Sequence, residues 1–304
     1  MKMLKKTITP EQVFKMKDIY ITKASGETAL FSTEKLRHSL SRSGADEETI
    51  NKIIHEVQAM LYEGITTKKI YKLAFGLLKK QSRPVAAKYK LKQAIMELGP
   101  SGFPFEQFVA ALLNHQGYAV KVGEIVKGKC VNHEIDVIAE KENQHFMIEC
   151  KYHNQLGTIS NVKIPLYIQA RFKDVEAAWV NIPGHGTKFH QGWVVTNTRF
   201  SDDAKQYGAC AGLKLIGWDY PFKENLKDMI DSMGLYPITC LTTLKKNEKI
   251  DLLDKKVVLC KEICQNPKLL KSVGVSEERI KGILEEGTAL CKNLTLHNQG
   301  SQKI

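Results

Sequence analysis

Apolar and polar positions in the first hundred residues predict a β-hairpin followed by helices. Residues 19–23 and 27–31 are β-rich and flank the turn sequence Ala24-Ser-Gly26. Apolar residues then recur at helical spacing in four segments that start at capping residues or a proline. These predicted helices run over about 34–43, 47–62, 67–80 and 84–98. We expect an α+β domain, a hairpin plus helical bundle, over residues 18–98, and Gly99–Gly102 as a linker.

The periodicity changes from Phe105 onward. An apolar stripe there predicts a helix that ends at Gly117. Beyond it the chain alternates between segments typical of strands, at 118–126, 132–139, 145–152, 192–196 and 213–216, and of helices, at 162–180 and 202–210. This order predicts an α/β domain over residues 103–220, with a mixed central sheet flanked by helices. Beyond Pro221 the pattern is helical to about Asn293, so residues 221–293 form a C-terminal helical segment.

The composition is typical of a globular protein in a reducing compartment. Hydrophobic residues make up 43% of the 304 and charged residues 26%. No apolar run approaches the roughly 18–20 residues of a membrane span, and no secretory signal follows the basic N-terminus. The seven cysteines contain no CxxC pair, and Cys260 and Cys264, four apart on one helix face, are interpreted as buried thiols. We therefore expect a cytoplasmic protein without a membrane partner.

The charge is strongly basic. The chain has 45 Lys and Arg against 33 Asp and Glu, a net charge of +12, and residues 1–100 hold 19 of the basic and 10 of the acidic side chains. A surplus of this size favours polyanionic partners, either nucleotide phosphates or a nucleic-acid backbone. A solvated basic face without a partner is the alternative.

Two of the predicted strands bring carboxylates together. An even-numbered hairpin loop centred on Glu142 and Asn143 would place Asp136 directly opposite Glu149. Directly opposed residues have β-carbons about 5 Å apart. Two bare carboxylates at that separation repel by about 3 kcal/mol at an effective dielectric constant near 20, so the pair needs a compensating cation.

The strand that contains Glu149 also contains a lysine, and the pair of strands offers oxygen donors for a metal ion. Lys151 shares a strand face with Glu149, whereas the Cys150 side chain turns to the other face, into the core. Asp136, Glu149 and the backbone carbonyl of Cys150 can together hold Mg²⁺, an ion that prefers oxygen. Beside such an ion, the Lys151 ammonium can stabilise a negatively charged transition state. This set is suited to phosphodiester hydrolysis, although its spacing alone fits a solvated Glu–Lys strand face equally well.

An ordered series of motifs accompanies this pair: Phe105-Glu-Gln-Phe, Gly117-Tyr118, His133-Glu-Ile-Asp136-Val-Ile, Ile148-Glu-Cys-Lys151, Val194-Val-Thr-Asn-Thr-Arg-Phe200-Ser with Ala204, and Gly212-Leu-Lys-Leu-Ile. Over about residues 103–220 the chain resembles the Mrr-like, type IV branch of the PD-(D/E)XK restriction endonucleases. The resemblance implies a Mg²⁺-dependent endonuclease whose metal site is formed by Asp136, Glu149 and Lys151, supported by Glu106. Many relatives have glutamine at the position of Glu149, and glycines where this chain has His133-Glu134.

A second set of motifs lies in the N-terminal segment: Ile21-Thr-Lys23-Ala-Ser-Gly26, Phe31-Ser-Thr-Glu-Lys35-Leu, Gly64-Ile-Thr-Thr67-Lys-Lys-Ile70 and Ala86-Ala-Lys88-Tyr89. Over about residues 18–98 these resemble the ATP-cone regulatory domain of ribonucleotide reductases. The resemblance implies that ATP or dATP binds at Lys23, Gly26, Lys35, Thr67 and Lys88. Ala24 stands where an arginine commonly follows the turn lysine. The alternative is a helical domain with surface lysines.

Two weaker patterns complete the sequence. Leu269–Ile280, with a glycine turn between two helices, resembles a degenerate helix-hairpin-helix that could present backbone N–H groups to phosphates. A plain helical packing domain is the alternative. His133, His185 and His190 lack the spacing of a zinc site and are interpreted as loop or surface histidines.

The sequence therefore favours a Mg²⁺-dependent DNA endonuclease modulated by ATP or dATP, with DNA and nucleotide as partners. Two alternatives remain. One is a nucleotide-sensing DNA-binding regulator that does not cleave, and the other is a regulator of nucleotide metabolism, a hypothesis that rests on analogy alone. A homo-oligomer is left open.

Overall fold

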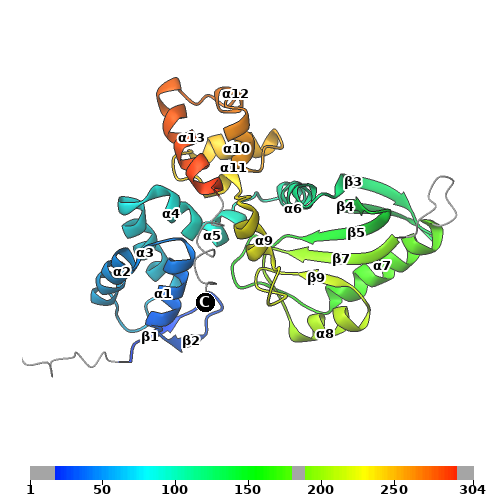
Figure 1. Ribbon diagram of the computed structural model, residues 1–304. Helices are drawn as coiled ribbons and strands as arrows, with labels where there is room; N and C mark the ends of the chain where they lie inside the picture. Colours follow the sequence, from blue (N-terminus) through cyan, green and yellow to red (C-terminus); the bar gives the residue numbers. More distant parts are fainter. Residues whose placement is uncertain (1–17, 180–188, 293–304) are drawn as a thin grey trace, which may run out of the picture.

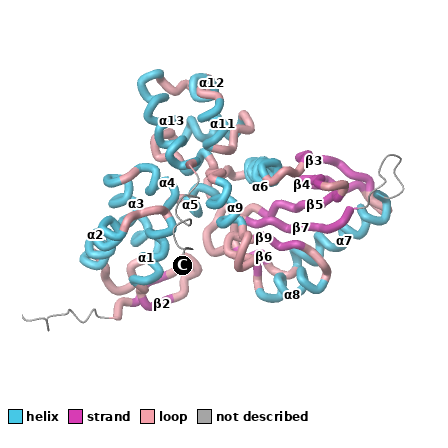
Figure 2. Tube along the Cα trace, in the orientation of Figure 1, coloured by secondary structure: helices cyan, strands magenta, loops and turns pink. Residues whose placement is uncertain are grey.

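The computed structural model describes residues 18–179 and 189–292. Figure 1 shows a hairpin and helices at the N-terminal end, a mixed sheet between helices, and further helices at the C-terminal end. Figure 2 shows the longer strands side by side, with helices around them. The predicted fold class is confirmed.

The N-terminal region begins with the antiparallel strands β1 (Tyr20–Thr22) and β2 (Thr28–Leu30). Its helices start where the side chains of Ser32, Asp46, Thr66 and Ser82 accept hydrogen bonds from backbone N–H groups of the first turn. The helices are α1 (Thr33–Arg42), α2 (Glu47–Ala59), α3 (Thr67–Gln81) and α4 (Arg83–Tyr89).

The last helix predicted for this region is interrupted. The sequence pattern predicts one helix from about Pro84 to Leu98, whereas α4 ends at Tyr89 and α5 (Leu91–Ile95) follows a turn at Lys90. Ala87 and Leu91, on either side of the turn, are both buried in the largest apolar core. Burial of both segments explains the break better than local propensity, which favours a continuous helix.

The central region contains a five-stranded sheet in the order β3-β4-β5-β7-β9. Strands β3, β4 and β5 are antiparallel, whereas β5, β7 and β9 are parallel, so the sheet is mixed as predicted. A small parallel pair, β6 and β8, lies apart from it. The strands are β3 (Ala119–Lys127), β4 (Asn132–Lys141), β5 (Gln144–Lys151), β6 (Ile159–Ser160), β7 (Phe189–Thr196), β8 (Arg199–Phe200) and β9 (Lys214–Ile216).

Helices cover both faces of this sheet (Figure 1). Helix α6 (Phe103–His115) lies on one face, and α7 (Lys163–Trp179) and α8 (Asp202–Cys210) lie on the other. On β5, Ile148 and Cys150 belong to the core under α6, whereas Met147 packs in a separate cluster with residues of α7. Because strand side chains alternate between faces, Glu149 and Lys151 project on the α7 side with Met147.

The C-terminal region is helical, as predicted. It contains α9 (Leu226–Met233), the short 3₁₀ helix η1 (Ile238–Cys240), α10 (Lys246–Asp254), α11 (Cys260–Gln265), α12 (Lys268–Lys271) and α13 (Glu277–Cys291). Cys260 is buried as predicted, whereas Cys264 is only half-buried, and both are free thiols. None of the helices in the described ranges is long and apolar enough to cross a membrane.

One apolar core joins the three regions. Leu91, Ala94 and Ile95 of α5 belong to the same buried cluster as residues of α6, the sheet and the C-terminal helices. The Thr239 hydroxyl donates to the Ala94 carbonyl at 2.7 Å, which ties η1 to α5. The predicted Gly99–Gly102 linker is therefore a short connection between two helices of one core, and it does not separate independent bodies.

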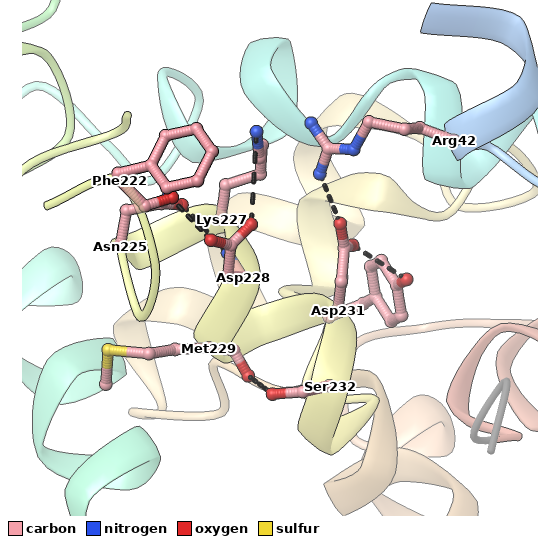
Figure 3. Close-up of polar contacts among 9 residues, drawn as sticks. Arg42, Phe222, Asn225, Lys227, Asp228, Met229, Asp231 and Ser232 are labelled. Carbon is pink, nitrogen blue, oxygen red and sulfur yellow. Dashed lines mark hydrogen bonds and ion pairs between the residues drawn. The ribbon is translucent and has the colours of Figure 1, made fainter. Parts of the chain in front are cut away.

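A polar contact fastens the N-terminal bundle at a second point. Arg42, at the end of α1, donates to the Asp231 carboxylate of α9 at 2.5 Å, and the Tyr236 hydroxyl donates to the other oxygen of that carboxylate at 3.0 Å (Figure 3). Both members of the Arg42–Asp231 ion pair are partly buried, so water screens the pair less than an exposed one.

A buried carboxylate organises the C-terminal helices. Glu286 of α13 accepts hydrogen bonds from the backbone N–H and the hydroxyl of both Thr242 and Thr243, at 2.5–2.9 Å. We expect Glu286→Ala to lower the free energy of unfolding by about 3 kcal/mol, because it leaves four partly buried donors without an acceptor. Chemical denaturation measures this loss. The matched control is Glu285→Ala at the exposed neighbouring position, and an equal effect of the two variants would contradict the expectation.

Candidate active site

The β4–β5 hairpin has the register that the sequence predicts. Its pairs run from Lys141 with Gln144 to Val137 with Ile148. The two loop residues, Glu142 and Asn143, have φ angles of 52° and 60°, the left-handed values that the tightest hairpin turns require. The same count, continued by one residue, sets Asp136 across from Glu149.

Asp136 lies where the strand pairing stops. The β4–β5 pairs end at Val137, and the β3–β4 pairing skips Asp136 and its counterpart Gly123, whose φ is 69°. The Asp136 carboxylate accepts a hydrogen bond from the Cys150 backbone N–H at 2.7 Å. The side chain thus provides the Cys150 N–H with an acceptor at the point where the β4–β5 backbone pairing has ended.

Glu149 has a cationic partner that was not predicted from the sequence. Arg171 of α7 donates to Glu149 Oε2 at 2.6 Å and also donates to the Glu134 backbone carbonyl. No short-range spacing links Arg171 to the hairpin. A signal was present, however, since Arg171 follows Ile168 by three positions and so borders the apolar face of a predicted helix. A charge at such a position needs a partner.

The other predicted catalytic residues are close to this pair. Lys151 is the last residue of β5 and is half-buried, and its backbone carbonyl accepts a hydrogen bond from the Thr196 hydroxyl at 2.8 Å. Glu106 lies in the first turn of α6. Its electrostatic partners include the carboxylates of Asp136, Glu134 and Glu149, so the helix brings it to the end of the hairpin where they meet.

Burial and neighbouring carboxylates raise the affinity of this cluster for protons. Burial, and then the charges of Asp136, Glu134 and Glu149, raise the pKa of Glu106 to about 7. Burial is also the main cause that raises the pKa of Asp136, against the lowering effect of the Cys150 N–H. For Glu149, burial and then Asp136 raise the pKa, and Arg171 opposes them. The cluster therefore favours the binding of protons or of a cation.

The donor set fits a hard divalent cation. Within residues 18–179 and 189–292, no three His, Cys, Asp or Glu side chains are arranged to hold a metal ion. The Cys150 thiol is buried in the core, but its backbone carbonyl points to the same side as its N–H, toward Asp136. Asp136, Glu149 and this carbonyl could therefore offer oxygen donors only, the kind that Mg²⁺ prefers.

The histidines considered above have other partners. His133 Nε2 lies 2.8 Å from Asp174 Oδ2, and His190 Nδ1 lies 3.2 Å from the His145 backbone nitrogen. His185 lies outside the described residues. The interpretation as loop or surface histidines is therefore wrong for His133, which lies in β4 with its side chain only 11% exposed against Asp174. It holds for His190 in so far as that residue of β7 is exposed.

The structure also places the residues expected to bind nucleotide. Gly26 closes the β1–β2 turn with φ of 86°, and Lys23 Nζ lies 3.1 Å from Glu27 Oε2. Lys35 is exposed in the first turn of α1. Thr67 opens α3, and Thr66 before it forms a bridge with Thr22, which brings this helix start beside the turn.

Lys88 lies at a different surface of the bundle. Its Nζ is 5.7 Å from the centre of the Tyr236 ring, and burial lowers its pKa. Lys88 therefore faces the C-terminal region, and within the described residues no contact joins it to the Lys23–Gly26 turn. Its role in nucleotide binding stays a prediction.

Comparison with known protein families agrees with this arrangement. Residues 19–94 match the ATP cone domain, residues 99–219 match the restriction endonuclease domain Mrr_cat, and residues 236–291 match the family described as AF1548-like, C-terminal. Both resemblances stated from the sequence are confirmed.

The chain is also similar to an individual protein and to a solved structure. An uncharacterized protein of Archaeoglobus fulgidus is 39% identical over 179 residues, which cover 59% of this chain and 97% of the relative. A solved structure, described as protein of unknown function AF1548, is 37% identical with a TM-score of 0.52, and the match covers 63% of this chain and 98% of that one.

The raised carboxyl pKa values predict a pH-dependent stability of the metal-free protein. Between about pH 4.5 and pH 7 the native state binds more protons than the unfolded chain, because the pKa of Glu106 rises from its ordinary 4.5 to about 7. We therefore expect stability to fall as the pH rises through this window. Thermal melts in EDTA from about pH 5 to about pH 8 measure the fall. Glu106→Gln should flatten the profile and the exposed Glu278→Gln should not, and identical profiles for all three proteins would refute the assignment.

Proposed function

We infer the function from the premise that this chain belongs to the AF1548-like family and carries an ATP cone ahead of a restriction-endonuclease-like domain. We propose that it is a Mg²⁺-dependent DNA endonuclease and that ATP or dATP at the cone modulates cleavage. The proposed division is a cone at 18–98, a nuclease at 103–220 and a helical segment at 221–293.

The convergence of Asp136, Glu149, Lys151 and Glu106 at one end of the β4–β5 hairpin carries this proposal. Asp136, Glu149 and the Cys150 carbonyl would hold Mg²⁺. The ion would supply positive charge that stabilises the phosphate while the phosphodiester bond is cleaved. The Lys151 ammonium is placed on the same strand face as Glu149 and can neutralise charge that develops on the phosphate. Glu106, with its pKa of about 7, can accept or release a proton near neutral pH.

Cleavage of plasmid DNA tests the proposal. We expect nicking in Mg²⁺ and none in EDTA, with a loss of about 100-fold or more in Asp136→Asn and in Lys151→Ala, because each removes charge stabilisation from the transition state. The control is Lys255→Ala, which removes an exposed lysine after α10. Undiminished nicking by Lys151→Ala would reject the site. DNA binding without any cleavage by the wild-type protein would favour the non-cleaving regulator instead.

Contacts between the cone and the segment after Lys151 support modulation by nucleotide. A β-carbon added at Gly157 would lie 3.8 Å from backbone atoms of Ala24 and Ser25, in the turn expected to bind nucleotide. The Tyr152 hydroxyl donates to the Met96 carbonyl, just after α5, at 2.7 Å. Through these contacts, a conformational change at the turn or in α5 would shift the residues that directly follow the proposed catalytic lysine.

A buried amide adds to this connection. Asn197 accepts a hydrogen bond from the His153 N–H at 2.8 Å and donates to the His153 carbonyl at 2.7 Å. The Asn197 Nδ2 also lies 3.2 Å from Met96 Sδ. Met96 thus contacts both the end of β5 and the segment after β7.

Tyr152→Phe tests whether these contacts carry the nucleotide signal. Because a ligand that binds only the native state stabilises it by about 2.7 kcal/mol at a hundredfold excess over Kd, ATP should raise the melting temperature of wild type and Tyr152→Phe alike. The ratio of cleavage rates with and without ATP should differ from one in wild type and move toward one in Tyr152→Phe.

Lys35→Ala is the matched control, since it should weaken the ATP-induced rise in melting temperature as well as the effect on cleavage. An unchanged ratio in Tyr152→Phe would contradict this route of coupling. Absence of any ATP-induced stabilisation in the wild type would remove the cone from the proposal and leave the nuclease.

A further inference from the structure

Arg171 makes three contacts that fix it on the face of the sheet. It donates to Glu149 Oε2 at 2.6 Å and to the Glu134 backbone carbonyl, and its guanidinium carbon lies 5.5 Å from the centre of the Tyr167 ring. The side chains of Arg171 and Glu149 are only 12% and 17% exposed. An ion pair at this depth is weakly screened, and loss of one member leaves a buried charge without a partner.

Arg171 contacts both strands of the β4–β5 hairpin. Glu134 belongs to β4 and Glu149 to β5, and the backbone pairing of these strands ends at Val137 and Ile148. Arg171 therefore spans the two strands beyond their last backbone pair. A guanidinium can do this because its donors form a rigid planar fork, whereas an ammonium is a point charge on a flexible stem.

The two carboxylates are held in the same way. Asp136 Oδ2 accepts from the Cys150 N–H, and Glu149 Oε2 accepts from Arg171. Within residues 18–179 and 189–292, the hydrogen bonds of this pair are to Asp136 Oδ2 and Glu149 Oε2, and none is to Asp136 Oδ1 or Glu149 Oε1. Each carboxylate thus has one oxygen anchored by the protein and the other left for a ligand.

We propose that Arg171 is a positioning residue, which anchors Glu149 through Oε2 so that Oε1 is presented, together with Asp136, to a divalent cation. The inference rests on the proposed function in assigning the cation to these carboxylates. It goes beyond that function in naming a residue of α7 that sets the geometry of the site without contacting the cation or the DNA.

Two other roles for Arg171 have different consequences. If Arg171 were only a counter-ion that the metal displaces, its removal would make the site more negative and would tighten cation binding. If it served only to hold α7 on the sheet, its removal would lower stability and leave cation affinity unchanged. A positioning role predicts weaker binding, since loss of a partner that orients a metal ligand typically costs about 10–100-fold in affinity.

Calorimetric titration of the full-length protein with Mg²⁺, in the absence of DNA, separates these roles. Asp136→Asn defines the binding that belongs to this site. We expect Arg171→Ala to raise the Mg²⁺ dissociation constant about 10–100-fold. The matched control is Lys173→Ala on the same helix, which removes a lysine paired with Glu176 and should bind Mg²⁺ as the wild type does.

Arg171→Lys keeps the charge but cannot bridge Glu149 and the Glu134 carbonyl with the same geometry. It tests the proposal even if Arg171→Ala fails to fold, because a counter-ion role predicts unchanged affinity and a positioning role predicts weaker binding. Tighter binding by Arg171→Ala, or unchanged affinity in the lysine variant, would overturn the proposal.

Absence of Asp136-dependent Mg²⁺ binding in the wild type would also overturn it. The result is distinguishable from failure of the nuclease proposal. Intact Mg²⁺ binding without plasmid cleavage would reject the endonuclease and leave the role of Arg171 standing.

Discussion

The register of the β4–β5 hairpin determines where the chemically active groups lie. Its two loop residues adopt left-handed backbone angles, and the pairing that follows from them places Ile148 and Cys150 under α6 and Glu149 on the α7 side. A slip of one residue would turn Glu149 and Lys151 into the apolar core. Because β5 is flanked by strands on both sides and covered on both faces, such a slip would bury two charges without partners.

Charge compensation is the second constraint on this site. Burial is the main cause that raises the pKa of Glu106, Asp136 and Glu149, and neighbouring carboxylates add to it. Nearby protein groups meet part of the need: the Cys150 N–H at Asp136 and the Arg171 guanidinium at Glu149. The remaining negative charge would attract a divalent cation. The buried carboxylates that destabilise the metal-free protein are therefore the groups that would bind the ion used in catalysis.

The third constraint is the shared core around α5. An ATP cone attached by a flexible linker could bind nucleotide without any consequence for the sheet. Here, the last turn of the cone is buried among residues of all three regions, and Met96 contacts both Tyr152 and Asn197 near the end of β5. Arg42 and Asp231 hold the bundle at a second point (Figure 3). Two attachments restrict rotation of the cone, so a rearrangement inside it would be passed to the strand ends.

The amino-acid sequence by itself determined the parts of this protein that depend on short-range rules. Alternation along β5 and an even-numbered loop centred on Glu142 and Asn143 were enough to predict that Glu149 and Lys151 share one strand face and that Cys150 lies in the core, and capping residues located most helix starts. Tertiary structure alone decided the rest. Arg171 reaches Glu149 from 22 positions away, Lys88 faces Tyr236, and the break at Lys90 lets α5 enter a common core. These features arise from packing between distant segments, where burial outweighs local propensity and spacing along the chain no longer specifies which side chains meet.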